Sequence, residues 1–354
     1  MSFGTIKLND GNELPAIAFG TGSVWKNKEV AEFVEQAIEC GYSHIDTAAI
    51  YHTEKDVGNA IRESGLDRQS LYIASKYDGG DIQSAIRESL DNLGLKQLDL
   101  YLIHAPFFVP NQDFESAWRE FEKIKEDGLA RSIGVSNFTV EHLKKLVKTA
   151  NILPAVNQIQ FHPYNLTQYK ETLEYCAEHG IVIEAYSSLA PITRLPGGPI
   201  DAPVAKAAKR LGATPTQVLL SWVRAKGAVI VTTSSKKEHL EEYLAVADLE
   251  PLTEDEIAAI DEAGTQGPPR PTRLWTLWPF VSLAITLHIM YRHFWLTIFG
   301  PARTLSAQHS VFTRCISSRN TALQIANIDI LLDGVAALET SMDRIGPYDE
   351  VHCV

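Results

Sequence analysis

The sequence has few of the residues that build metal centres and disulfide frameworks. Only 4 of its 354 residues are cysteine. They form no Cys-x-x-Cys pair, so neither a zinc knuckle nor a disulfide scaffold is predicted. The histidines lack metal-ligand spacing, and we therefore predict no metal site. Basic residues are outnumbered by acidic ones, 32 to 44, so the formal net charge is -12. A nucleic-acid partner is excluded on this ground, since binding phosphates requires a basic patch.

Three further absences narrow the compartment and the chemistry. Residues 1–15 contain no apolar run of the kind found in secretion signals, so we expect a reducing, cytoplasmic location. The segment from Gly134 to Phe138 contains a serine but does not complete Gly-x-Ser-x-Gly, which argues against a serine hydrolase. The segment from Gly20 to Trp25 lacks the third glycine of a dinucleotide fingerprint, which argues against an open nucleotide-binding sheet.

What is present is a regular alternation of strand and helix signals. Hydrophobic residues make up 45% and charged residues 21% of the chain, as in a globular protein. The predicted strands are short and rich in Val, Ile and Leu, which is typical of parallel strands buried on both faces. They cover residues 17–19, 44–46, 71–76, 98–104, 130–137, 155–162, 181–188 and 228–234. The predicted helices cover residues 29–40, 54–63, 81–93, 114–127, 140–149, 169–179, 204–226 and 237–246.

This strict alternation predicts an α/β fold, a (β/α)8 TIM barrel, rather than a doubly wound sheet. Residues 5–8 and 14–19 predict an N-terminal β-hairpin that caps the barrel. The pattern changes near Gly264. We therefore expect a barrel domain over residues 1–265 and an atypical C-terminal extension over residues 266–354.

The extension contains an apolar segment, 274–299, whose nature the sequence leaves open. Its core, residues 274–291, has no acid, lysine or arginine and is about 18 residues long, the lower edge of a membrane span. Pro279 and His288 interrupt it. The alternatives are a membrane-associated protein with its barrel facing the cytosol, an extra helix on the outer ring of the barrel, or a poorly folded extension.

Polar side chains end seven of the eight predicted strands. These residues are Asp46, Lys76, His104, Ser136 with Asn137, Gln158, Tyr186, and Thr233 with Ser234. Because the carboxyl ends of barrel strands meet on one face, where this fold builds its active sites, we expect these residues to form an active site.

The residue types indicate proton transfer. Asp46 and Lys76 can form a buried ion pair, and such a pair needs both partners. Tyr51 follows Asp46 by five residues. Its unperturbed pKa is about 10, and we expect the Lys76 ammonium to lower it, which would make Tyr51 a general acid. His104 can donate a hydrogen bond to a substrate carbonyl. Thr53 is predicted to cap the helix that follows.

Four stretches carry a resemblance to the aldo-keto reductase family: residues 41–58 (GYSHIDTAAIYHTEKDVG), 98–106 (LDLYLIHAP), 133–138 (IGVSNF) and 156–165 (VNQIQFHPYN). The resemblance covers roughly residues 4–265. It implies reduction of an aldehyde or ketone with NADPH as cofactor and a small carbonyl compound as substrate.

The resemblance also implies residue roles. Asp46, Tyr51, Lys76 and His104 match the four catalytic residues. Ser136, Asn137 and Gln158 match the contacts to the nicotinamide carboxamide, Tyr186 matches the aromatic residue that stacks on the nicotinamide ring, and Ser187 matches a pyrophosphate contact. Thr233, Ser234, Lys236 and His239 lie where the family binds the 2′-phosphate.

The chain departs from the family pattern at this phosphate site. Relatives commonly have Pro-Lys-Ser at the end of strand eight and an arginine six residues after the lysine. Here Thr232-Thr233-Ser234 stands in that place, with His239 instead of the arginine, and Lys236 or Lys237 can substitute. The run Val-Thr-Thr-Ser-Ser-Lys resembles a fungal branch of the family that reduces keto esters and keto amides.

The loop after Lys76 is short, and the extension replaces the family's specificity loop. We expect a monomeric reductase. The alternative is a catalytically retired, cofactor-binding sensor or structural protein on the same fold.

Overall fold

The computed structural model describes residues 3–22 and 25–269 of the chain, and its centre is a closed barrel of eight parallel strands. Around the barrel the strand order is β10-β3-β4-β5-β6-β7-β8-β9. The strands are β3 (Ile17–Gly20), β4 (His44–Asp46), β5 (Tyr72–Tyr77), β6 (Leu98–Ile103), β7 (Ala130–Ser136), β8 (Val156–Gln160), β9 (Val182–Tyr186) and β10 (Val229–Thr232). The predicted TIM barrel is confirmed.

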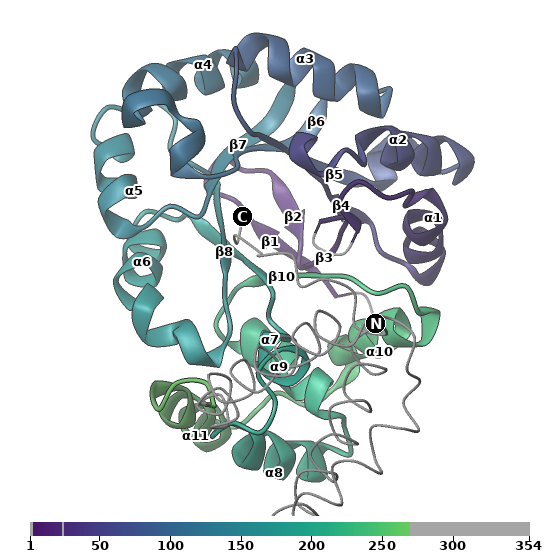
Figure 1. The fold of residues 1–354 in the computed structure, drawn as a ribbon, viewed down its shortest axis with the longest axis vertical. Coiled ribbons are helices and arrows are strands. Elements are labelled where there is room, and N and C mark those ends of the chain that lie inside the picture. Colours follow the sequence, from purple (N-terminus) through teal and green to yellow (C-terminus); the bar gives the residue numbers. More distant parts are fainter. Residues whose placement is uncertain (1–2, 23–24, 270–354) are drawn as a thin grey trace, which may run out of the picture. The chain divides into compact units, whose positions relative to one another are not determined.

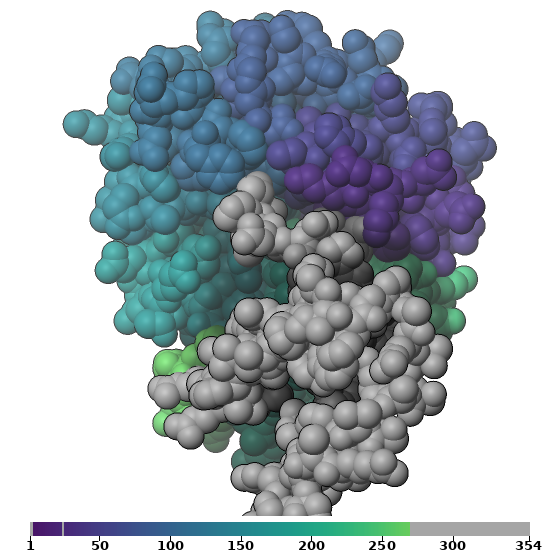
Figure 2. Space-filling model, viewed as in Figure 1, coloured from purple at the N-terminus to yellow at the C-terminus, as the bar shows by residue number. Residues whose placement is uncertain are grey.

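Helices surround the barrel in a ring, as Figure 1 shows. They are α1 (Ala31–Cys40), α2 (Glu54–Glu63), α3 (Ile82–Leu93), α4 (Phe114–Glu126), α5 (Val140–Val147), α6 (Leu166–Glu178), α7 (Ala190–Thr193), α8 (Asp201–Leu211), α9 (Pro215–Ala225), α10 (Lys237–Leu244) and α11 (Glu254–Thr265). In the space-filling view the colours follow the sequence around the molecule from purple through teal to green (Figure 2). Segments that are neighbours in sequence are thus neighbours in space.

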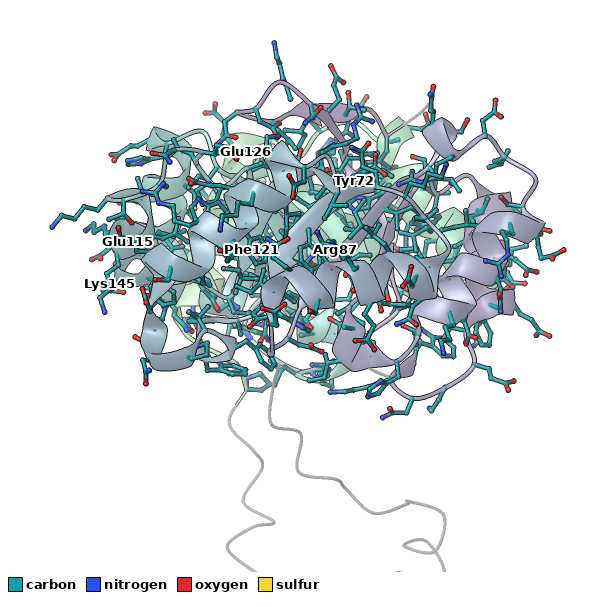
Figure 3. The ribbon with its side chains drawn as sticks, turned by 90° about the horizontal axis from the view of Figure 1, so that it is seen from above. Tyr72, Arg87, Glu115, Phe121, Glu126 and Lys145 are labelled. Carbon is teal, nitrogen blue, oxygen red and sulfur yellow. The ribbon has the colours of Figure 1, made fainter. Side chains whose placement is uncertain are left out.

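Two hydrophobic cores result from the alternation of side chains along each strand. One lies between the strands and the helices and includes Phe121, which is fully buried. The other fills the inside of the barrel and includes Ala74, Leu100 and Leu102. Helix α4 shows the pattern on its own, because Phe121 belongs to the core whereas Glu115 is exposed. Figure 3 shows Glu115 at the outer surface of the helix ring.

The predicted N-terminal hairpin is present as β1 (Thr5–Lys7) paired antiparallel with β2 (Glu13–Pro15). Leu8 and Leu14 are buried and join the core inside the barrel. Asn9 donates a hydrogen bond to the carbonyl oxygen of Pro154, just before β8, at 2.8 Å. The hairpin therefore caps the amino-terminal end of the barrel. Its second arm ends at Pro15, so β2 and β3 are separate strands rather than one continuous arm.

One predicted helix was wrong in extent. Residues 204–226 form two helices, because Gly212 ends α8 in a left-handed conformation at φ 60°. Thr214 then begins α9 with a capping box that includes Gln217, and Pro215 occupies the first turn.

The apolar segment 274–299 and most of the extension 266–354 lie outside the described residues. Within residues 3–22 and 25–269, no helix is both long and apolar enough to cross a membrane.

Candidate active site

The predicted ion pair between Asp46 and Lys76 lies at the carboxyl ends of β4 and β5. Lys76 Nζ donates to Asp46 Oδ1 at 2.7 Å, to Asp46 Oδ2 at 2.8 Å and to the carbonyl oxygen of Thr47 at 2.9 Å. The side chain of Lys76 is 0% exposed and that of Asp46 is 4% exposed. Both charges are thus withdrawn from water, and each depends on the other for compensation.

Tyr51 lies against this pair. It ends the short 3-10 helix η2 (Ala49–Tyr51), and Lys76 Nζ lies 5.2 Å from the centre of its ring. Its hydroxyl lies 3.4 Å from His104 Nε2. Gly22 makes room for the ring, because a Cβ at that position would come within 2.8 Å of Tyr51 Cζ. The four predicted catalytic residues therefore meet at one end of the barrel.

The predicted direction of the pKa of Tyr51 was wrong. Burial raises the pKa of the Tyr51 phenol above its ordinary value of 10.0, and the neighbouring Asp46 charge adds to the rise. The Lys76 charge lowers the pKa, as expected, but does not outweigh burial. Tyr51 is therefore protonated at neutral pH, with the Lys76 charge close enough to favour a phenolate there.

His104 follows β6 and is neutral at physiological pH. Burial, followed by the positive charges of Lys76 and Lys26, lowers the pKa of His104 to about 3. Its Nδ1 is buried and has no hydrogen-bond partner among the described residues. A neutral imidazole can donate from Nε2 to a substrate oxygen, but it cannot serve as a general acid at pH 7.

The four residues matched to the nicotinamide form one hydrogen-bonded group beside the ion pair. Ser136 Oγ donates to the carbonyl oxygen of Gln158 at 2.8 Å, and the backbone N–H of Asn137 donates to the same oxygen at 2.8 Å. Tyr186 Oη donates to Asn137 Oδ1 at 2.9 Å. Asn137 Nδ2 donates to the carbonyl oxygen of His104 at 3.0 Å, which joins this group to the catalytic four.

Two of the predicted cofactor contacts adopt a conformation that L-residues rarely take. Asn137 has φ 61° and Ser187 has φ 56°, each directly after a barrel strand. Such left-handed residues cost free energy and are concentrated at functional sites, where the surrounding structure holds them in place. Their position at the carboxyl ends of β7 and β9 is consistent with a pre-formed binding face.

The residues matched to the phosphate lie after β10. Trp25 Nε1 donates to Thr233 Oγ1 at 2.9 Å. Ser234 Oγ lies 3.2 Å from His239 Nδ1 and accepts the backbone N–H of Lys236 at 3.0 Å. Lys236 and His239 are exposed. All four residues lie in one short segment at the start of α10, on the same end of the barrel as the catalytic four.

Three features of the site differ from the sequence prediction: Gly22 and Glu184 were not predicted to belong to it, and the predicted role of Thr53 was wrong. Gly22 supports the Tyr51 ring by the absence of a side chain. Glu184, in the middle of β9, reaches the buried network and is 0% exposed. Thr53 occupies the cap position of α2 but makes no side-chain cap hydrogen bond. Its hydroxyl instead lies 2.9 Å from that of Thr21 and 3.0 Å from that of Thr47.

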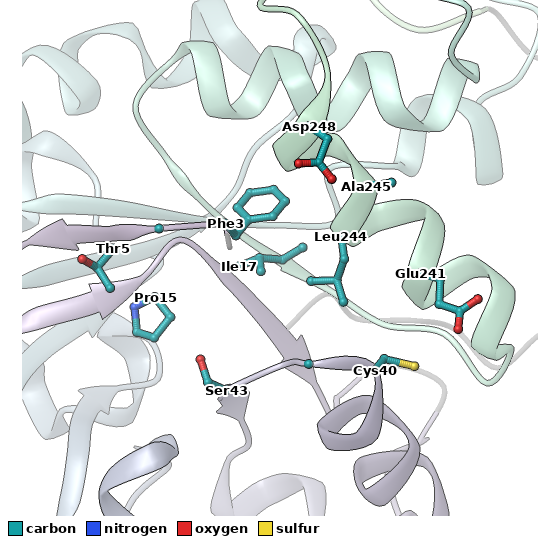
Figure 4. A pocket seen from close by; sticks show the side chains of 12 residues that line it. Phe3, Thr5, Pro15, Ile17, Cys40, Ser43, Glu241, Leu244, Ala245 and Asp248 are labelled. Carbon is teal, nitrogen blue, oxygen red and sulfur yellow. The ribbon is translucent and has the colours of Figure 1, made fainter. Parts of the chain in front are cut away.

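A cavity of about 600 Å³ lies at the opposite end of the barrel. It is lined by residues of the hairpin, of the segment before β4 and of the end of α10, among them Thr5, Ser43 and Leu244 (Figure 4). Because Ser43 precedes β4 whereas Asp46 ends it, the cavity is separated from the catalytic four by the length of the strands. It is not the candidate active site.

Comparison with known families decides what this barrel is. The model of the aldo/keto reductase family matches residues 1–265. The chain belongs to the aldo-keto reductase family. The resemblance seen in the four sequence stretches is thus confirmed.

Similar aldo-keto reductases include two curated fungal proteins. The NAD/NADP-dependent indole-3-acetaldehyde reductase of Schizosaccharomyces pombe is 37% identical over 268 residues, covering 73% of this chain and 93% of that protein. The NADPH-dependent alpha-keto amide reductase of Saccharomyces cerevisiae is 35% identical over 291 residues, covering 74% of this chain and 91% of that protein.

A solved aldo-keto reductase has the same fold. The Bombyx mori enzyme, crystallised in complex with NADP, superimposes with a TM-score of 0.69 at 32% identity. The match covers 78% of this chain and 97% of the Bombyx mori chain.

Proposed function

We propose that this enzyme reduces an aldehyde or ketone to an alcohol, with NADPH as the hydride source and Tyr51 as the proton donor. Its family makes it an NADP-dependent oxidoreductase, and its relatives include enzymes that use NADPH or bind NADP. The observation that carries the proton-donor role is the position of Tyr51. Its ring lies against the buried ammonium of Lys76, and its hydroxyl lies beside His104 Nε2.

The residues present fit the cofactor. Gln158 Nε2 already donates to Asp46 Oδ2 and Glu184 Oε2, which leaves Gln158 Oε1 as the acceptor for the carboxamide N–H₂ of nicotinamide. The ring of Tyr186 is half-buried and held by Asn137, as a stacking platform requires. Ser187 would contact the pyrophosphate, and Ser234, Lys236 and His239 would contact the 2′-phosphate. When bound, NADPH supplies the hydride that the carbonyl carbon accepts.

The protein's part is to deliver a proton to the carbonyl oxygen as that oxygen becomes negative. His104 Nε2 orients the oxygen by a hydrogen bond, and the O–H bond of Tyr51 breaks as the proton moves to the oxygen. The electron pair of that bond stays on Tyr51, which becomes a phenolate beside Lys76. Solvent then returns a proton to Tyr51. An alkoxide is a stronger base than a phenolate, so a donor with a raised pKa can still protonate it.

The alternative function, a retired cofactor-binding sensor, is not favoured. That reading predicts loss of a catalytic residue, and all four residues meet in the structure. Loss of NADPH absorbance with an aromatic aldehyde or an α-keto ester tests the proposal directly. Binding of NADPH without turnover of any carbonyl in a broad panel would instead support the sensor.

Replacing Tyr51 with phenylalanine removes only the donor hydroxyl. We expect reduction to fall by at least about a hundredfold, since a positioned acid typically contributes that much or more. NADPH affinity, measured by fluorescence titration, should change by no more than a few-fold. Residual turnover above about a hundredth of wild type would show that another group supplies the proton.

We also propose that residues 1–265 form the reductase domain and act as a monomer in the cytoplasm, with residues 266–354 as a separate extension. The domain boundary is supported by the family match, which ends where α11 ends. Size-exclusion chromatography and cell fractionation of the full chain, compared with a chain ending at residue 267, test both statements. Full-length protein in the membrane fraction, released by the truncation, would contradict the cytoplasmic location.

A further inference from the structure

A second buried carboxyl group lies beneath the catalytic four, and the proposed mechanism does not use it. Glu184 is in the middle of β9, faces the inside of the barrel and is 0% exposed. Gln158 Nε2 donates to Glu184 Oε2 at 2.8 Å and to Asp46 Oδ2 at 2.9 Å. One amide group therefore links Glu184 to the carboxyl group that holds Lys76.

The charges in this part of the barrel do not balance if both carboxyl groups are ionised. Lys76 directs its hydrogen bonds to Asp46 and to the Thr47 carbonyl, and none of them reaches Glu184. The other nearby base, His44, lies 3.8 Å from Glu184 Oε1 at its Nε2, which is too far for a hydrogen bond. Glu184 Oε1 is buried without a hydrogen-bond partner among the described residues. An ionised carboxylate there would be an uncompensated buried charge, which is strongly unfavourable.

The groups around Glu184 can be named from every strand that packs against it. On β8 and β10 its register partners are Gln158 and Val229, neither of which titrates. The titratable groups facing it are Asp46 and His44 from β4 and Lys76 and Tyr72 from β5. Burial, followed by the Asp46 charge, raises the pKa of Glu184 to about 8, and burial lowers the pKa of His44 to about 4. Both groups are thus neutral at pH 7.

We propose that Glu184 is a positioning residue whose proton keeps the charge of Lys76 available to Tyr51. The inference rests on the proposed function. When Tyr51 gives up its proton, a negative charge forms next to Lys76 and Asp46. A neutral Glu184 leaves Lys76 to stabilise that charge. An ionised Glu184 adds a second uncompensated negative charge, opposes the phenolate and slows proton transfer.

The proposal predicts a step in the pH profile. In the wild-type enzyme, kcat for carbonyl reduction at saturating NADPH should fall as pH rises through about 8. The expected fall is about three- to tenfold, because the like charge of an ionised Glu184 should shift the pKa of Tyr51 by up to about a unit. Glu184→Gln keeps an acceptor for Gln158 and cannot ionise, so the step should disappear. Glu54→Gln is the matched control. Glu54 is also buried, but its oxygens accept from Ser75 and Asn92, so the step should remain.

Thermal melting tests the same proton without measuring activity. The pKa of Glu184 is raised in the folded state, so its protonated form stabilises the fold below pH 4.5, and that stability is lost as pH rises toward about 8. The melting temperature of the wild type should therefore fall relative to that of Glu184→Gln across this window. Glu184→Met, an apolar chain of similar length, serves as the second variant if the glutamine variant does not fold.

The outcomes separate the inference from the function on which it rests. The inference is supported if the pH step in kcat disappears in Glu184→Gln and if the melting temperature of the wild type falls relative to that of Glu184→Gln as pH rises. Identical pH profiles in wild type and Glu184→Gln, or a melting difference independent of pH, would overturn it while wild-type turnover still upheld the proposed function. A wild-type protein that shows the melting signature but reduces no carbonyl would refute the proposed function, and with it the positioning role of Glu184.

Discussion

Replacing Lys76 with methionine should reveal how strongly the fold depends on the buried ion pair between Asp46 and Lys76. The change keeps most of the aliphatic chain and removes the ammonium. Asp46, 4% exposed, would lose all of its contacts with Nζ and keep the single hydrogen bond from Gln158. Breaking a buried ion pair from one side costs about 3–5 kcal/mol, because the remaining charge is uncompensated. For a domain of this size the melting temperature should fall by roughly 6–20 °C.

Urea denaturation and thermal melting measure this loss, and the chain supplies a matched control. Lys226 and Asp261 form the same kind of pair at 2.5 Å, but their side chains are 21% and 28% exposed. Lys226→Met should cost no more than about 1 kcal/mol, since partly exposed pairs are screened by solvent. Adding Asp46→Leu to Lys76→Met should restore most of the stability, but no activity, because an apolar pair removes the uncompensated charge. Equal losses for Lys76→Met and Lys226→Met, or no recovery in the double variant, would show that an uncompensated buried charge at Asp46 is not what destabilises the fold.

Two further predictions concern the edges of the site. Gly22→Ala places a Cβ 2.8 Å from Tyr51 Cζ. The Tyr51 ring must then shift, and kcat should fall by about tenfold to a hundredfold with little change in melting temperature. An unchanged kcat would show that the position of the Tyr51 ring is not critical. Lys236→Ala should raise the KM for NADPH and leave the KM for NADH nearly unchanged, because the proposed contact of Lys236 is with the 2′-phosphate, which NADH lacks. Lys237→Ala tests the other lysine that the sequence offers for this contact, and equal effects of Lys236→Ala on both cofactors would rule out a phosphate contact by Lys236.

Much of this fold is predictable because its signals are local. Each barrel strand is a short apolar run, and the polar residue that ends the strand comes at the end of that run in the sequence. Asp46, Lys76 and His104 could be placed on one face for that reason, since parallel strands share a carboxyl edge. The break between α8 and α9 was also predictable in principle. Gly212 followed by Thr214 and Pro215 is a typical end and start of helices, but the continuous apolar periodicity on both sides concealed it.

What could not be predicted depends on burial and on contacts between distant strands. The pKa of Tyr51 is set by how deeply the ring is buried, and spacing along the chain carries no measure of that depth. Thr53 has the right type and position for a helix cap, yet Thr21 and Thr47 offer its hydroxyl other partners. Glu184 lies inside an apolar strand, where a single acid indicates nothing until Gln158 and Asp46 from two other strands are placed around it.

Closure of the barrel has a consequence for how the chain folds during synthesis. The last barrel strand to be made, β10, pairs with the first barrel strand, β3, so that Ile230 lies opposite Ile17. Until β10 leaves the ribosome, one edge of β3 has no partner. At 5–20 residues per second, that interval lasts roughly 10–40 s. An unpaired, apolar strand edge is a site for aggregation. The nascent chain should therefore depend on chaperones for most of its synthesis, and this need should end abruptly once residue 232 has emerged.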